Sequence, residues 1–349
     1  MVHILKSKFL PFLVKEIFLV SSFFAFLISV ILTKKIDFNI NDFEPIFILF
    51  FLFIAIKGLE DSLLLLYIAK NIESQRFVAF KLVIIAFVFS ALFNIDVAIV
   101  ALLPLILMMN LKNKELLVIL VAFTTHLGGA LLPFSTPQNL FIFSFYNIKL
   151  FDFIKTIAPF SLTLFIIFLI ISLFFKTQKA KKIKINFNKK DATLFSIFLI
   201  IVILSLFKII PLIFCFILSI FIFIFKKDAL KVDYATLFTF VFFLLASKNF
   251  YLIFKNYHPN NIFNAVIVLS QFISNVPATL ILHKFTNDYK PLLIGANIAS
   301  FGTIVASLAN ILTYKIYLKY NKDGFRFFIK LQIYGILCNI VGILIYKIF

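Results

Sequence analysis

The stretch 124–140 reads TTHLGGALLPFSTPQNL, and it interrupts a chain that is otherwise rich in phenylalanine, leucine and isoleucine. It brings two glycines and two prolines together with several polar side chains. Glycine tolerates non-helical backbone angles, and proline lacks the amide hydrogen that a helix needs. The stretch therefore predicts a helix that stops and restarts within 115–147.

The composition around this stretch is that of a membrane protein. Hydrophobic residues make up 63% of the chain, and the mean hydropathy is +1.10. Apolar runs long enough to cross about 30 Å of hydrocarbon recur along the sequence. The formal net charge is +19, but the lysines gather in short breaks between apolar runs, as in cytoplasmic loops. We expect a polytopic α-helical membrane protein that binds the lipid bilayer and no nucleic acid.

The apolar runs define three kinds of segment. Continuous spans are expected at 17–33, 46–66, 155–175, 193–208, 209–225, 234–254 and 327–347. Spans broken by glycine, proline or polar residues are expected at 115–147 and 290–314. Helical hairpins that enter and leave on one side are expected at 77–109 and 261–287, because each arm is too short to cross the membrane.

The distribution of positive charge gives the expected orientation. With hairpins that do not cross, one set of loops holds 23 of the 34 lysine and arginine residues. This bias places the N-terminus and the loop 176–190, with seven lysines, in the cytoplasm. We expect a multi-pass protein of the cell inner (plasma) membrane.

The order of segments predicts an internal repeat. Residues 1–175 form an N-terminal repeat, 176–208 a lysine-rich loop and a linking span, and 209–349 a second, inverted repeat. The broken spans align without gaps, so that His126 matches Asn297, Thr136 matches Ser307 and Asn139 matches Asn310. Inverted repeats with paired broken helices are typical of secondary transporters.

The interruptions also carry the polar chemistry. Non-helical backbone at membrane depth is tolerated where it lines a cavity or is buried in protein. Freed carbonyls can hold a cation, and the helix that restarts near Gln138 offers its N-terminus to an anion. A proline kink repaired by neighbouring helices is the alternative.

Asp96 interrupts an apolar arm, and a carboxylate there is costly in hydrocarbon. We expect Asp96 to face a polar cavity with a partner; the alternative is a structural salt bridge with a lysine. For His126, proton coupling and plain hydrogen bonding are equally good interpretations. Lys57 is expected to pair with Asp61 one helical turn away. The other histidines, His3, His258 and His283, are expected to be solvated.

Four motifs resemble those of the ion transporter superfamily. They are NIDVAIVALLP (94–104), HLGGALLPFSTPQNL (126–140), SNVPATLIL (274–282) and GANIASFGTIVASLAN (295–310). The chain looks most similar to the arsenite permease and sodium–proton antiporter branch, related to the citrate and dicarboxylate transporters. The resemblance implies two inverted repeats, each with a re-entrant hairpin and an unwound helix.

The resemblance and the polar interruptions together give the candidate binding residues. In the first half they are Asn94, Asp96, His126, Gly128, Gly129, Pro133, Thr136, Pro137 and Asn139. In the second half they are Ser274, Asn275, Thr279, Asn297, Gly302, Thr303, Ser307 and Asn310. A sodium site is expected at Asn275, Asn297 and Asn310. The chain departs from the family pattern at Ile95 and His126 in the first half, and at Ala299 and Ser300 in the second loop. The first site is therefore expected to bind a different ion or to bind it poorly, and the second site is expected to be better kept.

We therefore expect a secondary active transporter, not an enzyme, without a cofactor. Its substrate would be a small anion, an oxyanion of the arsenite type or a citrate-like carboxylate, coupled to a proton or sodium gradient. The alternative is a sodium–proton antiporter in which Asp96, with or without His126, exchanges protons for sodium. The resemblance also implies a homodimer.

Overall fold

The computed structural model of the chain describes residues 17–35, 43–64, 67–68, 77–108, 113–175, 186–254, 259, 261–321 and 323–348. Within these residues every regular element is a helix. The predicted all-α class is confirmed. Much of the lysine-rich loop lies outside the described residues, as do the N-terminal lysines, His3 and His258.

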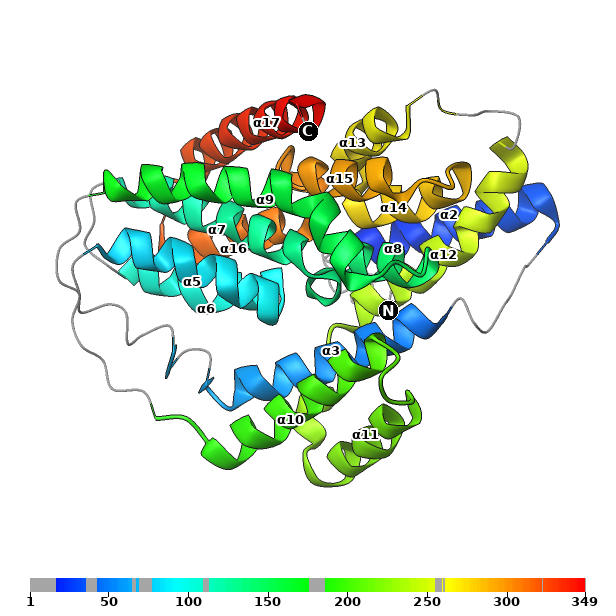
Figure 1. Cartoon of the computed structure of the whole chain (residues 1–349), viewed down its shortest axis with the longest axis horizontal. Helices are drawn as coiled ribbons and strands as arrows, with labels where there is room; N and C mark the ends of the chain where they lie inside the picture. Colours follow the sequence, from blue (N-terminus) through cyan, green and yellow to red (C-terminus); the bar gives the residue numbers. More distant parts are fainter. Residues whose placement is uncertain are drawn as a thin grey trace, which may run out of the picture.

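The helices follow the expected order (Figure 1). The first half of the chain contains α2 (Ile17–Thr33), α3 (Glu44–Asp61), α5 (Val78–Leu92), α6 (Ile95–Met108), α7 (Lys114–Leu131), η2 (Pro133–Ser135), α8 (Pro137–Phe145) and α9 (Leu150–Leu173). The second half contains α10 (Lys189–Leu206), α11 (Ile213–Phe225), η3 (Lys227–Leu230), α12 (Tyr234–Phe254), α13 (Ile262–Ile273), α14 (Asn275–Leu282), η4 (His283–Phe285), α15 (Tyr289–Ala299), η5 (Ile304–Ala306), α16 (Leu308–Tyr320) and α17 (Gly324–Ile348).

Four helical segments among the described residues are both long and apolar enough to cross a membrane. They are α7, α9, the segment Lys227–Phe254 that contains α12, and α17. Helix α3 ends at Asp61, five residues before the predicted boundary, at a cluster of charge. There Lys57 Nζ lies 2.9 Å from Asp61 Oδ1 and 3.3 Å from Glu60 Oε2. The predicted pair of Lys57 and Asp61 is confirmed.

Both predicted helix interruptions are present. Between α7 and α8 the chain passes through the short helix η2, and Thr136 precedes α8 in an extended conformation (φ −143°, ψ 147°). Between α15 and α16 it passes through η5, and Ser307 precedes α16 in nearly the same conformation (φ −147°, ψ 138°). We call these two segments the first break (132–136) and the second break (300–307).

Both predicted hairpins are pairs of short helices. In the first pair, α5 and α6 have 15 and 14 residues and are joined at Phe93 and Asn94. In the second pair, α13 and α14 have 12 and 8 residues and are joined at Ser274. At 1.5 Å per residue the longest of these arms is about 22 Å, which is shorter than a bilayer core of about 30 Å.

The hairpins and the broken helices pack together in a crossed arrangement. Helix α5 packs on α7, and α13 packs on α15, within their own halves. The second arm of each hairpin contacts the restarted helix of the other half, α6 against α16 and α14 against α8. Outside this assembly α2 packs on α12, and α3 packs on α10 to form a separate layer with α11 (Figure 1).

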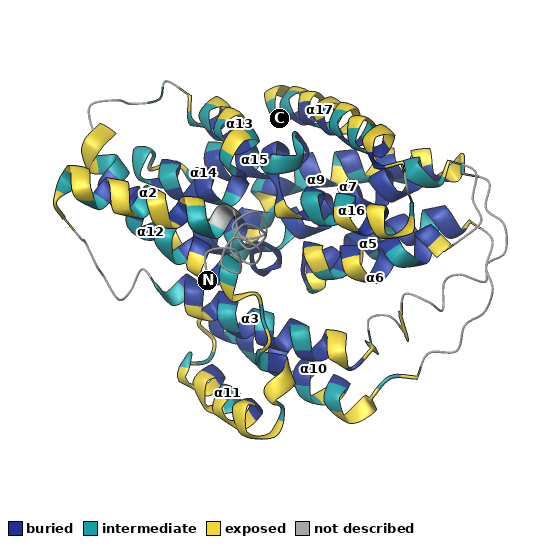
Figure 2. Ribbon diagram, turned by 180° about the vertical axis from the view of Figure 1, so that it is seen from behind, coloured by how far each residue is buried: buried dark blue, intermediate teal, exposed yellow. Residues whose placement is uncertain are grey.

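Several helices expose much of their length (Figure 2), and many of the exposed side chains are large and apolar. Helix α11 buries only Cys215 and Ile222. Its exposed large side chains are Ile213, Phe214, Phe216, Ile217, Ile220, Phe221, Phe223, Ile224 and Phe225. Contiguous exposed apolar patches of this kind belong to proteins that meet lipid or another protein. This surface agrees with a multi-pass membrane protein.

Candidate functional site

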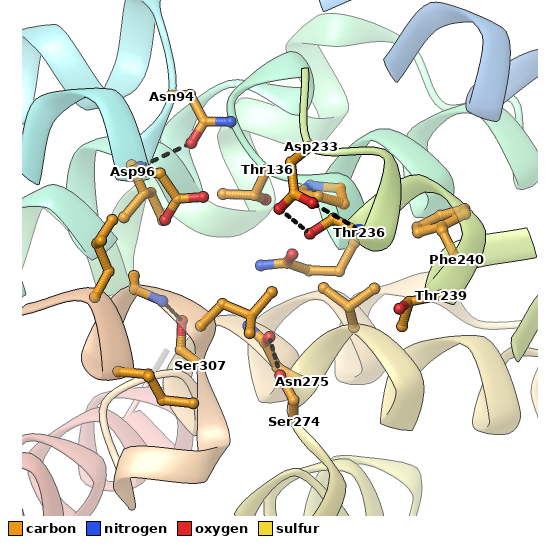
Figure 3. Close-up of a pocket in the computed structure, with 18 of the residues that line it drawn as sticks. Asn94, Asp96, Thr136, Asp233, Thr236, Thr239, Phe240, Ser274, Asn275 and Ser307 are labelled. Atoms are coloured by element: carbon orange, nitrogen blue, oxygen red, sulfur yellow. Dashed lines mark hydrogen bonds between the residues drawn. The ribbon is translucent and has the colours of Figure 1, made fainter. Parts of the chain in front are cut away.

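Both hairpin tips and both breaks line one cavity of about 370 Å³ (Figure 3). The first half contributes the tip 94–96 and the segment 136–138. The second half contributes the tip 274–277 and the segment 307–309. The start of α12, one face of α16 and Phe53 of α3 complete the wall. The four interruptions that the sequence marks as polar therefore meet at one place.

Four helices begin at the cavity wall. Helix α6 starts at Ile95, α8 at Pro137, α14 at Asn275 and α16 at Leu308, and all four residues line the cavity. The first amide groups of a helix have no partner inside it and carry partial positive charge. The backbone alone therefore makes the wall favourable for an anion, since each such terminus is worth about 0.3–1 kcal/mol to a nearby negative charge.

Two carboxylates and one lysine also face the cavity. Asp96, Asp233 and Lys315 line it, and all three residues are exposed to it. The Asp96 amide donates to Asn94 Oδ1 at 2.8 Å, so Asn94 fixes the start of α6. Asp96 lines the cavity as expected. The expected partner is missing, because within the described part of the chain its carboxylate makes neither a hydrogen bond nor an ion pair. The alternative of a salt bridge with a lysine is not formed within the described part of the chain, in which Asp96 has no ion pair.

Thr136 lies at the same wall with an unused hydroxyl. Its side chain is 4% exposed, and Oγ1 has no hydrogen-bond partner. The matching residue of the second break, Ser307, uses its hydroxyl to accept from the Ala309 amide at 3.3 Å. The Thr136 hydroxyl is therefore buried beside the cavity without a partner, while the Ser307 hydroxyl caps α16.

The tip of the second hairpin is held in a strained conformation. Ser274 has φ 77° and ψ 153°, a region that side chains other than glycine rarely adopt. Its hydroxyl donates to the Ala306 carbonyl at 3.4 Å, and Asn275 Nδ2 donates to the Ala296 carbonyl at 3.4 Å. These contacts tie the tip to the broken helix of its own half. Strain of this kind is typical of positions where a backbone must approach a ligand.

Behind the cavity, four of the predicted residues bind one another. His126 Nε2 lies 3.0 Å from Asn310 Oδ1, and Asn139 and Asn297 exchange hydrogen bonds of 3.3 and 2.8 Å. All four side chains are buried, and none lines the cavity. We call these four residues the asparagine–histidine cluster. It joins the two broken helices to each other.

The cluster also occupies carbonyls that the breaks set free. Asn139 Nδ2 donates to the Gly129 and Ala130 carbonyls, each at 3.3 Å. Asn310 Nδ2 donates to the Ser300 and Thr303 carbonyls at 2.9 and 3.1 Å. A buried carbonyl without a partner is costly. Each asparagine side chain therefore supplies the hydrogen bonds that backbone amides would have donated to these carbonyls in an unbroken helix.

The predicted glycines lie where neighbouring groups approach closely. A Cβ atom on Gly128 would be 2.0 Å from the Phe87 carbonyl oxygen, and one on Gly129 would be 2.4 Å from Ile95 Cγ1. On Gly302 it would be 1.9 Å from Gln271 Oε1. These glycines allow each hairpin to pack against its broken helix, and none of them lines the cavity.

Of the remaining predicted residues, Thr303, Pro133 and Thr279 do not line the cavity, and Pro137 does. Thr303 donates its amide to Gln271 Oε1 at 2.7 Å and its hydroxyl to the Gln271 carbonyl at 2.9 Å, and so anchors the second break. Pro133 begins η2, and Thr279 is fully buried within α14; neither lines the cavity. Pro137, by contrast, lines it at the start of α8.

Of the three residues of the predicted sodium site, only Asn275 lines the cavity. The Asn297 Oδ1 atom accepts from Asn139, and the Asn310 Oδ1 atom is engaged with His126. Two of the three side-chain oxygens are therefore already used within the cluster. The three asparagines do not meet in one open coordination position.

Sequence reasoning missed Asp233, Thr236, Thr239 and Lys315, all of which line the cavity. Asp233 resembles an ordinary helix start, since it accepts from the Thr236 amide at 3.0 Å and the Thr236 hydroxyl at 2.6 Å. Only the position of α12 beside the two tips brings it to the site. In the sequence, Asp233 stands just before an apolar helix and three residues before Thr236. This spacing predicts a helix cap, but it does not indicate that the residue lines a cavity.

The expected solvation of His283 is wrong. Its side chain is 1% exposed and lies edge-on to Phe141 and Phe145, with ring centroids 4.8 and 4.5 Å away. His283 Nδ1 contacts the Leu280 carbonyl at 2.7 Å. The short helix η4 turns the residue inward onto α8, whereas its position after an apolar arm had indicated a loop.

Comparison with known proteins agrees with this geometry. A family model described as citrate transporter matches residues 12–290. A curated protein of Methanocaldococcus jannaschii, called an uncharacterized transporter, is 32% identical over 296 residues, which cover 80% of this chain and 82% of that protein. That name states transport and no substrate. The match over residues 12–290 shows that the chain belongs to the citrate transporter family of the ion transporter superfamily.

Proposed function

We propose that the protein is a secondary active transporter of a small anion, a citrate-like carboxylate or an oxyanion, coupled to a proton or sodium gradient. The observation that carries this proposal is the meeting of four helix N-termini at one cavity. Backbone amides recognise negative charge without a fixed arginine or metal, and so can release the anion again. The family's citrate transporter description supports a carboxylate as the first substrate to test.

The proposed architecture is two inverted repeats with re-entrant hairpins. The short arms and the crossed packing of α6 with α16 and α14 with α8 support it. The asparagine–histidine cluster supports it further. In the alignment of the two halves, His126 matches Asn297, and Asn139 matches Asn310. His126 contacts Asn310, and Asn139 contacts Asn297, so the same pair of positions meets twice with the halves exchanged. A two-fold relation between the halves would produce this reciprocal pairing.

The cavity would open to the cytoplasm in this conformation. Lys315 lies in a segment that the positive-inside rule assigns to the cytoplasm, and Asp233 follows another such segment, 226–231. The cell inner membrane and the orientation of the N-terminus remain predictions, as does a homodimer. Alternating access would then require the assembly of hairpins and broken helices to move relative to the layer of α3, α10 and α11.

A sodium–proton antiporter is the second candidate, and one observation favours it. Asp96 presents a carboxylate to the cavity without an ion-pair partner in the described residues. Such a group can bind a proton or a cation in turn. Against this candidate, four positive helix termini would repel a transported cation.

Transport in proteoliposomes separates the two candidates. Radiolabelled citrate, other carboxylates and arsenite would be offered with an imposed proton gradient, an imposed sodium gradient, or neither. We expect accumulation of one anion above equilibrium with one of the gradients. The second assay uses vesicles with an acidic lumen that contains a pH dye, in buffer free of these anions.

The outcomes are distinct. Gradient-driven anion accumulation supports the proposal. Lumenal alkalinisation on addition of sodium, lost in Asp96→Asn and without uptake of any anion, would replace the proposal with the antiporter.

A further inference from the structure

The wall of the cavity carries charge of both signs, and the two signs come from different elements. Asp96 stands in the first turn of α6, and Asp233 caps the start of α12. Helices α8, α14 and α16 also begin in the wall, and none of them has an acidic residue in its first turn. The positive ends of these three helices are therefore not neutralised by carboxylates of their own.

The two signs lie on opposite sides of the cavity. In Figure 3 the carboxylates of Asp96 and Asp233 lie in the upper part of the view, whereas Asn275 and Ser307 lie in the lower part. Asn275 is the first residue of α14, and Ser307 is the N-cap of α16. The charge of Asp233 acts on Asp96, so the two carboxylates form one negative side. The starts of α14 and α16 form the opposite, positive side.

The carboxylates keep most of their capacity to bind a ligand. In the part of the chain that the structure describes, the Asp96 carboxylate has no hydrogen bond, and each oxygen of Asp233 accepts one bond, from Thr236. Lys315 lines the cavity two helical turns beyond the start of α16, about 10 Å along the helix. Among the described residues it pairs with neither carboxylate. These residues therefore supply no cation to the negative side.

Gln138 gives independent evidence that a ligand belongs in this space. Its side chain is 3% exposed and lines the cavity, and it makes no hydrogen bond within the described residues. A buried amide without a partner is costly, because it has given up its bonds to water and formed none to protein. An amide both donates and accepts, so Gln138 can bind an ammonium or a carboxylate of one ligand.

We propose that the transported anion is an amino-dicarboxylate, whose ammonium binds Asp96 and Asp233 and whose carboxylates face the starts of α14 and α16. An ammonium has three donors, which suit two carboxylates and the Gln138 amide oxygen. The helix-start amides and Lys315 remain for the carboxylates of the ligand.

The overall charge and size of such a ligand fit the site. A second carboxylate keeps the molecule anionic, in agreement with the proposed function, on which this inference rests because it names the substrate class of the same site. The cavity of about 370 Å³ is near the lower end of the range for ligand sites, roughly 300–1,000 Å³. A small molecule is therefore expected.

Two pairs of probes isolate the amino group. L-Aspartate differs from succinate, and L-glutamate from glutarate, by one amino group. Purified full-length protein in detergent would be titrated with each of the four compounds at neutral pH in a buffer that contains sodium. Binding would be followed by calorimetry and by the rise in thermal stability that a ligand of the folded state produces.

We expect at least one of the two amino-dicarboxylates to bind about tenfold or more tightly than its counterpart without the amino group. The physical reason is that succinate and glutarate leave both aspartates unpaired and are repelled by them. Equal or tighter binding of succinate and glutarate would overturn the inference, as would a protein that binds none of the four compounds.

Removal of one charge gives a test that a general loss of folding cannot imitate. Asp233→Asn keeps an oxygen for the α12 cap and removes the charge. Its dissociation constant should rise about tenfold or more for the preferred amino-dicarboxylate, and should fall or stay the same for the matching compound without the amino group. Unchanged affinity for the amino compound, or an equal loss for both, would contradict the inference.

The matched control is Asp228→Asn. Asp228 is an exposed carboxylate five residues from Asp233, pairs with Lys231 at 2.7 Å and does not line the cavity. This variant should bind all four compounds like the unmodified protein. A loss as large as that of Asp233→Asn would mean that the general charge of this region, and not contact with the ligand, decides the affinity, and would overturn the inference.

Transport separates this inference from the proposed function. Binding of an amino-dicarboxylate in preference to its counterpart, without accumulation of any anion in the vesicles, would support the inference and contradict the proposed function. Gradient-driven uptake of citrate or arsenite, together with no preference for the amino group, would support the proposed function and overturn the inference.

Discussion

His126 and Asn310 are joined across 184 residues of sequence by a contact of 3.0 Å between Nε2 and Oδ1. Asn297 occupies the position that matches His126, and it bonds to Asn139, which matches Asn310. One pair is therefore imidazole to amide, and the other is amide to amide. The histidine is the only difference in chemistry between two otherwise equivalent contacts.

This asymmetry gives a test of what the histidine does. His126→Asn should make the first pair resemble the second and keep anion uptake at a level near that of the unmodified protein. The physical reason is that asparagine can both donate and accept, as its three counterparts do. Uptake would be measured with and without an imposed proton gradient.

The control is His126→Leu, which removes the bond and leaves Asn310 Oδ1 unpaired. Loss of one buried partner costs about 1–3 kcal/mol, so this variant should unfold at a lower temperature. If His126→Asn is folded but no longer responds to a proton gradient, the histidine couples protons and the hydrogen-bonding interpretation is wrong.

Close packing of the first hairpin on its broken helix gives a second prediction. Gly128→Ala should lower the free energy of unfolding by about 1–3 kcal/mol, because its Cβ would meet the Phe87 carbonyl oxygen at 2.0 Å and Ser90 Oγ at 2.3 Å. Thermal unfolding in detergent, followed by the fraction that remains monodisperse, would show this.

The matched control is Gly342→Ala on α17. Its Cβ would meet only side chains, Ile298 Cγ1 and Phe160 Cε2, each at 3.0 Å. Side chains can shift by a few tenths of an ångström, and alanine favours the helix. We expect a change of about 1 kcal/mol or less, and equal losses in both variants would contradict this explanation.

The breaks and the pairs of short helices could be predicted from the sequence because each has a local cause, while the re-entrant course of those pairs stays a prediction. Pro133 and Pro137 mark the first break directly, whereas Gly128 and Gly129 lie inside α7 and allow close packing. The second break contains no proline, and its single glycine is Gly302. Its prediction therefore depended on the alignment with the first break. The arms were predicted as hairpins because their apolar runs are short, and length is a property that sequence displays.

Which polar residues face the cavity could not be predicted in the same way. Asn139 and Asn297 are 158 residues apart, and their mutual bonds turn both side chains away from the cavity wall. Asp233 reaches the cavity only because α12 packs beside α14. Contacts between distant segments decide these positions, and a local pattern carries no information on them.

Thr303 gives a third prediction, which separates structural support from binding. Thr303→Val removes the hydroxyl bond to the Gln271 carbonyl and should lower stability by about 1 kcal/mol. The KM for the anion should not change, since Thr303 does not line the cavity. Thr303→Ser keeps the hydroxyl and should retain both properties. A raised KM in Thr303→Val with normal stability would contradict this prediction and would indicate that Thr303 takes part in anion binding.

The fourth prediction concerns the positive end of α16. Ser307 lines the cavity and caps α16 through its hydroxyl. Aspartate and asparagine are caps of similar quality, so Ser307→Asp and Ser307→Asn should both fold. Only the aspartate places a fixed negative charge where the substrate anion would bind.

Anion uptake should distinguish this pair of variants. We expect Ser307→Asp to raise the KM about tenfold or more, because its carboxylate competes for the helix terminus and repels the substrate. Ser307→Asn should stay within about threefold of the unmodified protein, a range that corresponds to less than 1 kcal/mol. Uptake that is equal in the two variants would mean that the anion does not approach the N-terminus of α16. Sodium–proton exchange that is stronger in Ser307→Asp would favour a cation as the transported ion, because the added charge attracts one.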